Sequence, residues 1–288
     1  MNEMAQSTER EMIVSVIQIN ASDRDKEGNI QKILDFLDVA GRRGSDLVVL
    51  PETFTGTGLG DNETYKVIAE EIPGPTTDRI AAKAAEYGMT IVGSLYERGQ
   101  DGAIHNTAPV IDPSGKIQIK YRKSHLFDPL SRPDIPHVHE SEKVTAGSEL
   151  VMAETKQCKI GVAICSDLRF PEIFLNYALK GAEIVVVPTA FLAPRADHWE
   201  FLLRARATDN QYFVIGSGMF GTLDTAPIGF VGRSMVVDPW GVTLAQAPDR
   251  ECCITTVINL DNVRQVRSWW PLNEQRRPTL YNGLKRQA

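Results

Sequence analysis

Short runs of aliphatic residues alternate along this chain with longer segments in which apolar positions recur every three or four residues. The short runs are rich in β-branched residues and predict buried strands, which we expect at 13–19, 46–50, 89–96, 107–112, 116–121, 159–164 and 184–189. The longer segments have the spacing of one helix face, and we expect helices at 28–43, 75–88, 171–180 and 196–210. Helices that alternate with buried strands predict an α/β domain built in layers.

Two of the expected strands resemble each other. Residues 46–52 read DLVVLPE and residues 183–189 read EIVVVPT, so each has an acid, four aliphatic residues and a proline in the same register. Proline cannot donate to a sheet ladder and marks the end of each strand, the edge at which α/β sheets bind ligands. The likeness indicates either two similar halves or merely the shared composition of buried strands. Because no linker divides the chain, we expect one domain at 12–288 after a loose tail at 1–11.

The composition excludes several classes of protein. Lys and Arg number 31 against 37 Asp and Glu, a net charge of −6, whereas proteins that bind nucleic acid through phosphates carry a basic excess. The longest apolar stretch, 184–194, is shorter than the roughly 20 residues of a membrane helix. Four cysteines are too few for a disulfide framework in a chain of 288 residues. We therefore expect a soluble, cytoplasmic protein without a nucleic-acid or membrane partner.

One cysteine has the context of a catalytic nucleophile. The expected strand at 159–164 leads into Cys165, and Pro171 suits the first turn of the helix that follows. Backbone N–H groups in such a turn point toward a bound oxyanion, and the helix together with a nearby cation would lower the thiol pKa. The alternative is an inert buried cysteine, the common fate of free thiols. The remaining cysteines lack this turn, and we expect structural roles for Cys158, Cys252 and Cys253.

A cysteine nucleophile needs a base, and two kinds of residue could supply it. None of the five histidines lies in the signature of a cysteine protease. Glu52 directly follows Pro51 at the end of the strand at 46–50, so it would share an edge with Cys165 if the two similar strands lie in one core. A partly desolvated glutamate at that edge could act as a proton shuttle, whereas most glutamates after strands are solvated loop acids.

Five short motifs, taken together, resemble those of the nitrilase superfamily of carbon–nitrogen hydrolases. They are LPETF at 50–54, YRKSHLF at 121–127, ICSDLRFPE at 164–172, the segment 198–211 with LRARATDNQ, and VDPWG at 237–241. Each motif is weak alone, but their order and spacing are those of the family, and the resemblance runs from about Ile13 to Tyr281.

The resemblance implies a fold and a catalytic set. The fold is a four-layer αββα sandwich. Carried over position by position, Glu52 is the general base, Lys123 is the cation that stabilises the oxyanion, and Cys165 is the nucleophile. A second glutamate often precedes the cysteine in the family, and Glu140, seven residues before Gly147, matches that place better than Glu142. The set needs no cofactor.

The residues after the nucleophile favour one reaction. Nitrile-hydrolysing members resemble Cys-Trp-Glu here, whereas this chain has Cys165-Ser-Asp and resembles the branch of ω-amidases and deaminated-glutathione amidases. We therefore expect hydrolysis of a small carboxamide to acid and ammonia. An N-carbamoyl amino acid hydrolase or a nitrilase on the same residues is the alternative, and a catalytically silent binding protein is a third. The loop from Lys123 to Glu140 is about one residue longer than expected and could reshape the pocket.

Two arginines are candidates for holding a substrate carboxylate. The segment 189–195 leaves the second of the similar strands, so Phe191 and Arg195 are expected to line the site. Arg233 stands where the related amidases usually carry histidine. A guanidinium offers a bidentate fork for a carboxylate, which favours an ω-amide of a dicarboxylic acid as substrate. The alternative is that both arginines are solvated on the surface.

Other motifs favour neither a metal nor a nucleotide. His137 and His139 alternate before Glu140 and could be ligands, but no further ligand at the usual spacing completes the set, so we expect no metal. The glycine-rich stretches at 216–218 and 229–232 lack the context of a phosphate-binding loop.

Apolar surface is expected at two places. The helix at 196–210 carries Trp199, Leu202, Leu203 and Ala207 at helical spacing, and a Trp-Trp-Pro sequence begins at Trp269. Relatives use these regions to dimerise, and a monomer would leave the apolar surface exposed. We expect a homodimer, or a multiple of one, with the C-terminal tail at the interface.

Overall fold

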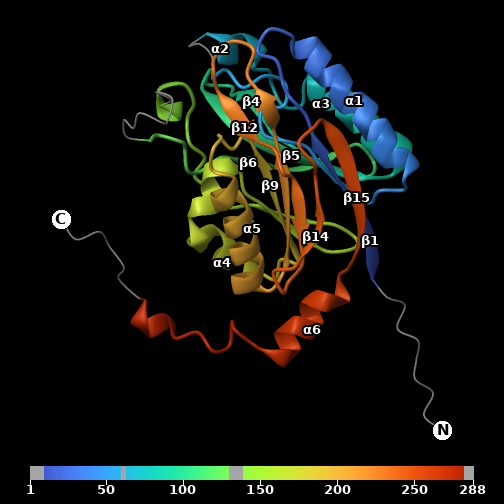
Figure 1. Cartoon of the computed structure of the whole chain (residues 1–288), viewed down its shortest axis with the longest axis vertical. Helices are drawn as coiled ribbons and strands as arrows, with labels where there is room; N and C mark the ends of the chain where they lie inside the picture. Colours follow the sequence, from blue (N-terminus) through green and yellow to red (C-terminus); the bar gives the residue numbers. More distant parts are fainter. Residues whose placement is uncertain (1–9, 60–62, 130–138, 282–288) are drawn as a thin grey trace.

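Two β-sheets lie face to face, with helices on the outer face of each (Figure 1). The computed structural model describes residues 10–59, 63–129 and 139–281. Helices α1 (Lys26–Arg42) and α3 (Pro75–Tyr87) cover one sheet, and α4 (Pro171–Leu179) and α5 (Ala196–Asn210) cover the other. The expected four-layer αββα sandwich is confirmed.

The first sheet has seven strands in the order β15-β1-β2-β3-β5-β4, with β6 also paired to β5. Their bounds are β1 Glu11–Gln18, β2 Leu47–Val49, β3 Thr90–Val92, β4 Leu95–Arg98, β5 Ile104–Ile111, β6 Ile117–Arg122 and β15 Cys252–Asn259. The second sheet has six strands in the order β14-β13-β10-β9-β8-β7. Their bounds are β7 Met152–Glu154, β8 Lys159–Val162, β9 Ile184–Thr189, β10 Phe213–Gly218, β13 Met235–Val237 and β14 Thr243–Gln246.

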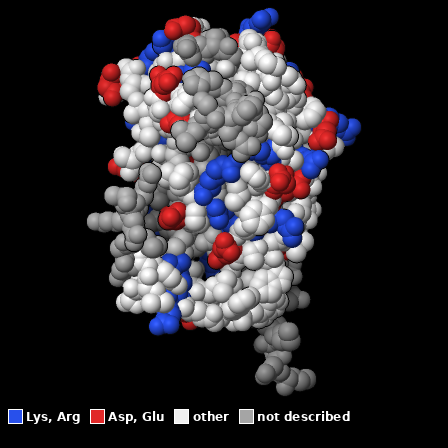
Figure 2. Space-filling view, turned by 60° about the vertical axis from the view of Figure 1, so that its left-hand side comes forward, with Lys and Arg blue, Asp and Glu red and all other residues white. Residues whose placement is uncertain are grey.

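Smaller elements connect the layers. A two-stranded ribbon joins β11 (Phe220–Thr222) to β12 (Gly229–Val231), and short helices are α2 (Thr64–Ile68), α6 (Asp261–Trp269), η1 (Glu140–Glu142), η2 (Cys165–Arg169) and η3 (Pro278–Leu280). None of the described helices combines the length and apolar composition that crossing a bilayer requires. On the face seen in Figure 2, acidic and basic side chains of the described residues are mixed rather than gathered by sign.

Most predicted elements are present, and the differences have local causes. Helix α1 begins two residues before the predicted start because the Asp25 side chain caps it by accepting a hydrogen bond from the Gly28 N–H at 2.8 Å. The single strand predicted at 89–96 is divided into β3 and β4 around Gly93, where a Cβ would lie 2.5 Å from Leu50 Cβ. Strand β1 already begins at Glu11, so only 1–9 of the predicted tail lies outside the described residues.

The two similar strands occupy equivalent places in the two sheets. Strand β2 lies between the parallel strands β1 and β3, and β9 lies between the parallel strands β8 and β10. Leu47 and Val49 of β2 pack in the same core as Val185 and Val187 of β9. The carboxyl ends of β2 and β9 therefore meet at one edge of the sandwich, which is where the predicted catalytic residues lie.

The apolar face of α5 packs against the chain's own core. Trp199, Leu203 and Ala207 are fully buried in this core, so they are not part of an apolar surface that a monomer would expose, while the homodimer itself stays a prediction. Gly216 on β10 makes room for the indole, because a Cβ there would lie 2.6 Å from the Trp199 ring. The exposed apolar residue of α5 is Phe201, which is 68% exposed.

Candidate active site

Cys165 lies at a sharp turn between β8 and α4. It is the first residue of η2 and has a φ of 45°, a left-handed conformation that is costly for a residue with a side chain. The buried carboxylate of Asp167 supports the turn by accepting hydrogen bonds from the Ile164 N–H at 2.9 Å and the Tyr121 hydroxyl at 2.7 Å. The turn places Cys165 in the lining of a pocket that the other three predicted catalytic residues also line.

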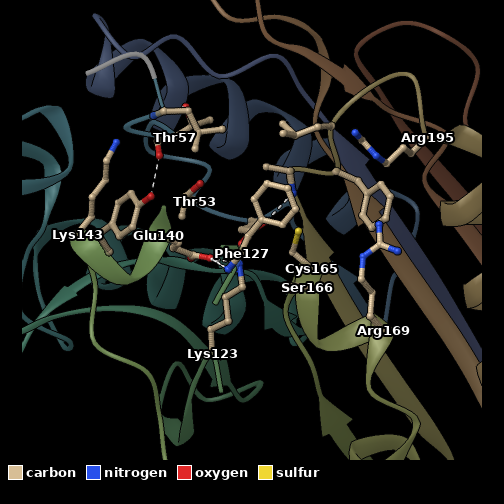
Figure 3. A pocket seen from close by; sticks show the side chains of 16 residues that line it. Thr53, Thr57, Lys123, Phe127, Glu140, Lys143, Cys165, Ser166, Arg169 and Arg195 are labelled. Atoms are coloured by element: carbon tan, nitrogen blue, oxygen red, sulfur yellow. Dashed lines mark hydrogen bonds and ion pairs between the residues drawn. The ribbon is translucent and has the colours of Figure 1, made fainter. Parts of the chain in front are cut away.

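Three charged side chains are buried together beside Cys165 (Figure 3). Lys123 Nζ lies 2.9 Å from Glu52 Oε1 and 2.8 Å from Glu140 Oε2, and all three residues are at most 9% exposed. The structure thus brings together the four residues predicted as the catalytic set. A buried ammonium between two buried carboxylates is stable only as a set, because removing one member leaves an uncompensated charge.

Each member of this set lies at the end of a strand or the start of a helix, and the two glutamates also accept hydrogen bonds from backbone N–H groups. Glu52 follows β2, and its Oε2 accepts the Ala190 N–H, just past β9, at 2.7 Å. Lys123 follows β6. Glu140 begins η1, and its Oε2 accepts the Phe127 N–H at 2.7 Å. Glu52 therefore links the two sheets at the edge where they meet.

The charges set the protonation of the lysine and the cysteine. Burial lowers the pKa of Lys123, but the charges of Glu140 and Glu52 outweigh burial and raise this pKa well above its usual value, so the ammonium persists. Burial and the Glu52 carboxylate raise the pKa of Cys165 to about 12, although Lys123 acts in the opposite direction. The expectation of a lowered thiol pKa is therefore wrong, because the cation is shared with two carboxylates and the turn is desolvated.

The opposite side of the pocket carries two arginines. Phe191 and Arg195 line the pocket as predicted, and Arg169 joins them (Figure 3). The guanidinium carbon of Arg169 lies 5.1 Å from the centre of the Phe191 ring. Burial lowers the pKa of Arg169, and the positive charge of Arg195 lowers it further. Sequence reasoning missed Arg169, although its place four residues after Cys165, in the same short turn, was a signal.

The structure does not bring Arg233 to the pocket. Its side chain is 42% exposed, and Nη1 lies 2.8 Å from Glu200 Oε1, outside the pocket lining. Its backbone carbonyl accepts a hydrogen bond from Trp199 Nε1 at 2.9 Å, which ties this position to the core beneath α5. The interpretation of Arg233 as a substrate-binding residue is corrected accordingly.

A second residue that sequence reasoning missed is Asn106. Its Nδ2 lies 2.8 Å from Glu52 Oε1 and 3.4 Å from Glu140 Oε1. The strand was predicted to begin at 107, whereas β5 begins at Ile104, so Asn106 is an inward position within the strand. The available signal was the run of three polar residues, His105, Asn106 and Thr107, directly before the apolar residues of this strand.

The histidine pair has no metal-binding surroundings among the described residues. Within 10–59, 63–129 and 139–281, no group of three or more His, Cys, Asp or Glu side chains is arranged to hold a metal ion. His137 lies outside the described residues, and Glu140 is paired with Lys123. The absence of a metal site stays a prediction.

Comparisons with known proteins agree with this geometry. The family model for carbon-nitrogen hydrolases matches residues 13–268. The chain is 36% identical over 273 residues to omega-amidase NIT2 of Danio rerio and 33% identical over 269 residues to omega-amidase NIT2 of Homo sapiens, in each case over 93% of this chain and 96% of the relative. The crystal structure of Saccharomyces cerevisiae Nit3, a member of branch 10 of the nitrilase superfamily, superposes with a TM-score of 0.82 at 30% identity, over 93% of this chain and 97% of that one.

The amidase homologues share the chemistry of amide C–N hydrolysis, and the buried glutamates, lysine and cysteine at the meeting edge of the two sheets suit that reaction. By sequence and by fold, the chain belongs to the carbon-nitrogen hydrolase family and is a hydrolase acting on amide C–N bonds.

Proposed function

We propose that the protein hydrolyses the ω-amide of a small dicarboxylic acid to the acid and ammonia through a thioester on Cys165. One observation carries the proposal: a single pocket has the Glu52–Lys123–Glu140 set on one side of Cys165 and two arginines on the other. The names of the relatives, omega-amidases, support the same class of substrate.

The first half of the reaction forms the thioester. Glu52 accepts the thiol proton of Cys165 while the sulfur attacks the carbonyl carbon of the amide. The resulting oxyanion is stabilised by the Lys123 ammonium, which needs no reorientation because two carboxylates already hold it. The protonated Glu52 then gives its proton to the amide nitrogen, the C–N bond breaks and ammonia leaves.

The second half restores the enzyme. Glu52 takes a proton from a water molecule while the oxygen of that water attacks the thioester carbon. The C–S bond breaks, the acid leaves, and the proton returns to the Cys165 sulfur. Because the pKa of Cys165 is raised to about 12, the free enzyme holds a thiol, and a base beside it is required rather than merely helpful.

The arginines account for the rest of the substrate. Arg169 and Arg195 lie on the same side of the pocket, near enough for the charge of Arg195 to affect the pKa of Arg169. A carboxylate that binds between two guanidinium groups offsets their repulsion and forms charge-assisted hydrogen bonds. An amide carbon at Cys165 and a carboxylate at the arginines describe the monoamide of a short dicarboxylic acid.

The proposal is tested by incubating the enzyme separately with glutaramate, succinamate, N-carbamoyl amino acids and simple nitriles, with ammonia and acid as the readout. Preferred release of ammonia from the ω-amides is the expected result. Preferred turnover of the N-carbamoyl compounds or the nitriles would show that the proposed substrate class is wrong. Turnover of none of the compounds would favour a catalytically silent binding protein.

We also propose that the protein forms a homodimer. Trp240, Trp269 and Trp270 are each at least 49% exposed, and the rings of Trp240 and Trp269 lie 6.3 Å apart. Helix α6 and the described segment after it lie below the lower end of the sandwich in Figure 1. Burying these indoles against a second copy would remove a large apolar surface from water.

A further inference from the structure

The side-chain amide of Asn106 faces both glutamates of the site. Asn106 is 1% exposed, and its Nδ2 donates to Glu52 Oε1 at 2.8 Å and lies 3.4 Å from Glu140 Oε1. In the described part of the chain its own Oδ1 has no hydrogen-bond partner. The amide is thus oriented so that its NH₂ group donates to the carboxylates while its own carbonyl oxygen receives no hydrogen bond.

The two oxygens of Glu52 have different hydrogen-bond partners. Oε1 accepts from Lys123 Nζ at 2.9 Å and from Asn106 Nδ2 at 2.8 Å, which uses both of its lone pairs. Oε2 accepts from the Ala190 N–H at 2.7 Å, and Ala190 lines the pocket with Cys165. A carboxylate oxygen with one donor retains capacity for a second proton donor, whereas an oxygen with two donors does not.

We propose that Asn106 is a positioning residue that occupies Oε1 of Glu52, so that Oε2 is the atom that receives the Cys165 proton and later returns it to the leaving nitrogen. This inference rests on the proposed function. It requires no new reactant, because the proton that Oε2 gains from sulfur is the one that it gives to ammonia.

The charges of the neighbouring side chains explain why an amide suits position 106. Glu52, Glu140 and Lys123 together carry one net negative charge in a desolvated site. An amide adds a donor without changing that charge. A lysine there would neutralise the set and favour the unprotonated carboxylates too strongly for Glu52 to carry a proton, and an aspartate would add a further repulsive charge.

The test compares Asn106→Leu and Asn106→Asp with Thr107→Val. Both Asn106 variants remove the donor, and losing a donor to an ionised carboxylate favours the protonated form. We expect kcat to fall by about tenfold or more with little change in KM, and the acid limb of the kcat/KM profile to move to higher pH by about one pH unit, further for Asn106→Asp.

Thr107→Val is the matched control. Thr107 is the next residue of β5, is equally buried, and donates from Oγ1 to a carboxylate, Glu97 Oε2, at 2.8 Å, away from the pocket. Its loss lowers stability without moving the acid limb. Alkylation of Cys165 by iodoacetamide at different pH values gives the same comparison without a substrate, so it separates this inference from the proposed function.

The positioning role would be overturned if both Asn106 variants had the same kcat and the same acid limb as Thr107→Val, even with the ω-amidase activity established. Turnover of no amide by the wild-type enzyme would instead remove the proposed function, and the alkylation profile would still decide the role of Asn106.

Discussion

Replacing Lys123 by methionine tests whether the buried charges beside Cys165 act as one set. The substitution keeps the length of the side chain and removes the ammonium that lies within 2.9 Å of both Glu52 and Glu140. Two carboxylates are then left buried without a counter-charge. We expect the free energy of unfolding to fall by about 3–5 kcal/mol at neutral pH, the loss typical of breaking a buried ion pair.

The expected loss can be followed by thermal unfolding. With an unfolding entropy of about 2.1 cal/mol/K per residue, a chain of 288 residues has about 0.6 kcal/mol/K in total, so Tm should fall by about 5–8 °C. The deficit should shrink as the pH falls, because a carboxylate that lost its cation takes up a proton more readily in the folded state. A carboxylate whose pKa is higher in the folded than in the unfolded state stabilises the folded variant at low pH, and this stabilisation is lost as the pH rises.

Lys83→Met is the matched control. Lys83 also lies between two carboxylates, with Nζ 2.5 Å from Asp38 Oδ1 and 3.0 Å from Glu86 Oε2, but it lies on the surface with the Glu86 side chain 52% exposed. A surface pair of this kind contributes about 1 kcal/mol or less. Equal losses of Tm in the two variants, or a Lys123→Met deficit that does not shrink on acidification, would refute the reasoning.

Three further predictions follow from the site and the surface. Arg169→Ala or Arg195→Ala should raise KM for an ω-carboxylate amide by about tenfold or more, about 1.4 kcal/mol, and leave an uncharged amide of equal length nearly unaffected, with Arg233→Ala as an unaffected control; equal effects on both amides would contradict carboxylate binding. Iodoacetamide should label Cys165 faster than Cys158, whose pKa burial also raises to about 12 but which lies outside the pocket that holds Glu52, and Glu52→Gln should slow the labelling of Cys165; labelling at equal rates would argue against base assistance. Light scattering at micromolar concentration should give at least twice the 31.9 kDa of one chain, and a monomer would contradict the dimer.

Much of the fold could be predicted from local sequence patterns. The aliphatic runs, the helical spacing and the prolines near the carboxyl ends of β2 and β9 are properties of neighbouring residues, so they predicted the elements and the edge at which Glu52 and Cys165 meet. Lys123 and Glu140 were identified by resemblance, because they lie 71 and 88 positions from Glu52 in the chain and nothing local relates them.

The errors concern properties that depend on packing. The pKa of Cys165 is raised rather than lowered because burial desolvates the thiol and because the Glu52 charge adds to this effect while the nearest cation, Lys123, is shared by two carboxylates. Only the assembled site reveals these effects. The periodicity of α5 indicated an apolar face but not whether the chain's own core or a second subunit covers it. Arg169 and Arg233 are chemically alike, and the direction of each backbone segment decides which one reaches the pocket.

The most direct test of the central claim is to look for the thioester itself. The enzyme is mixed with excess glutaramate, quenched in acid within the first turnovers, digested and analysed by mass spectrometry. The account predicts an acyl group, with the mass of the substrate less ammonia, on the peptide that carries Cys165, and it predicts neither adduct nor turnover in Cys165→Ala. Turnover that survives in Cys165→Ala would contradict it.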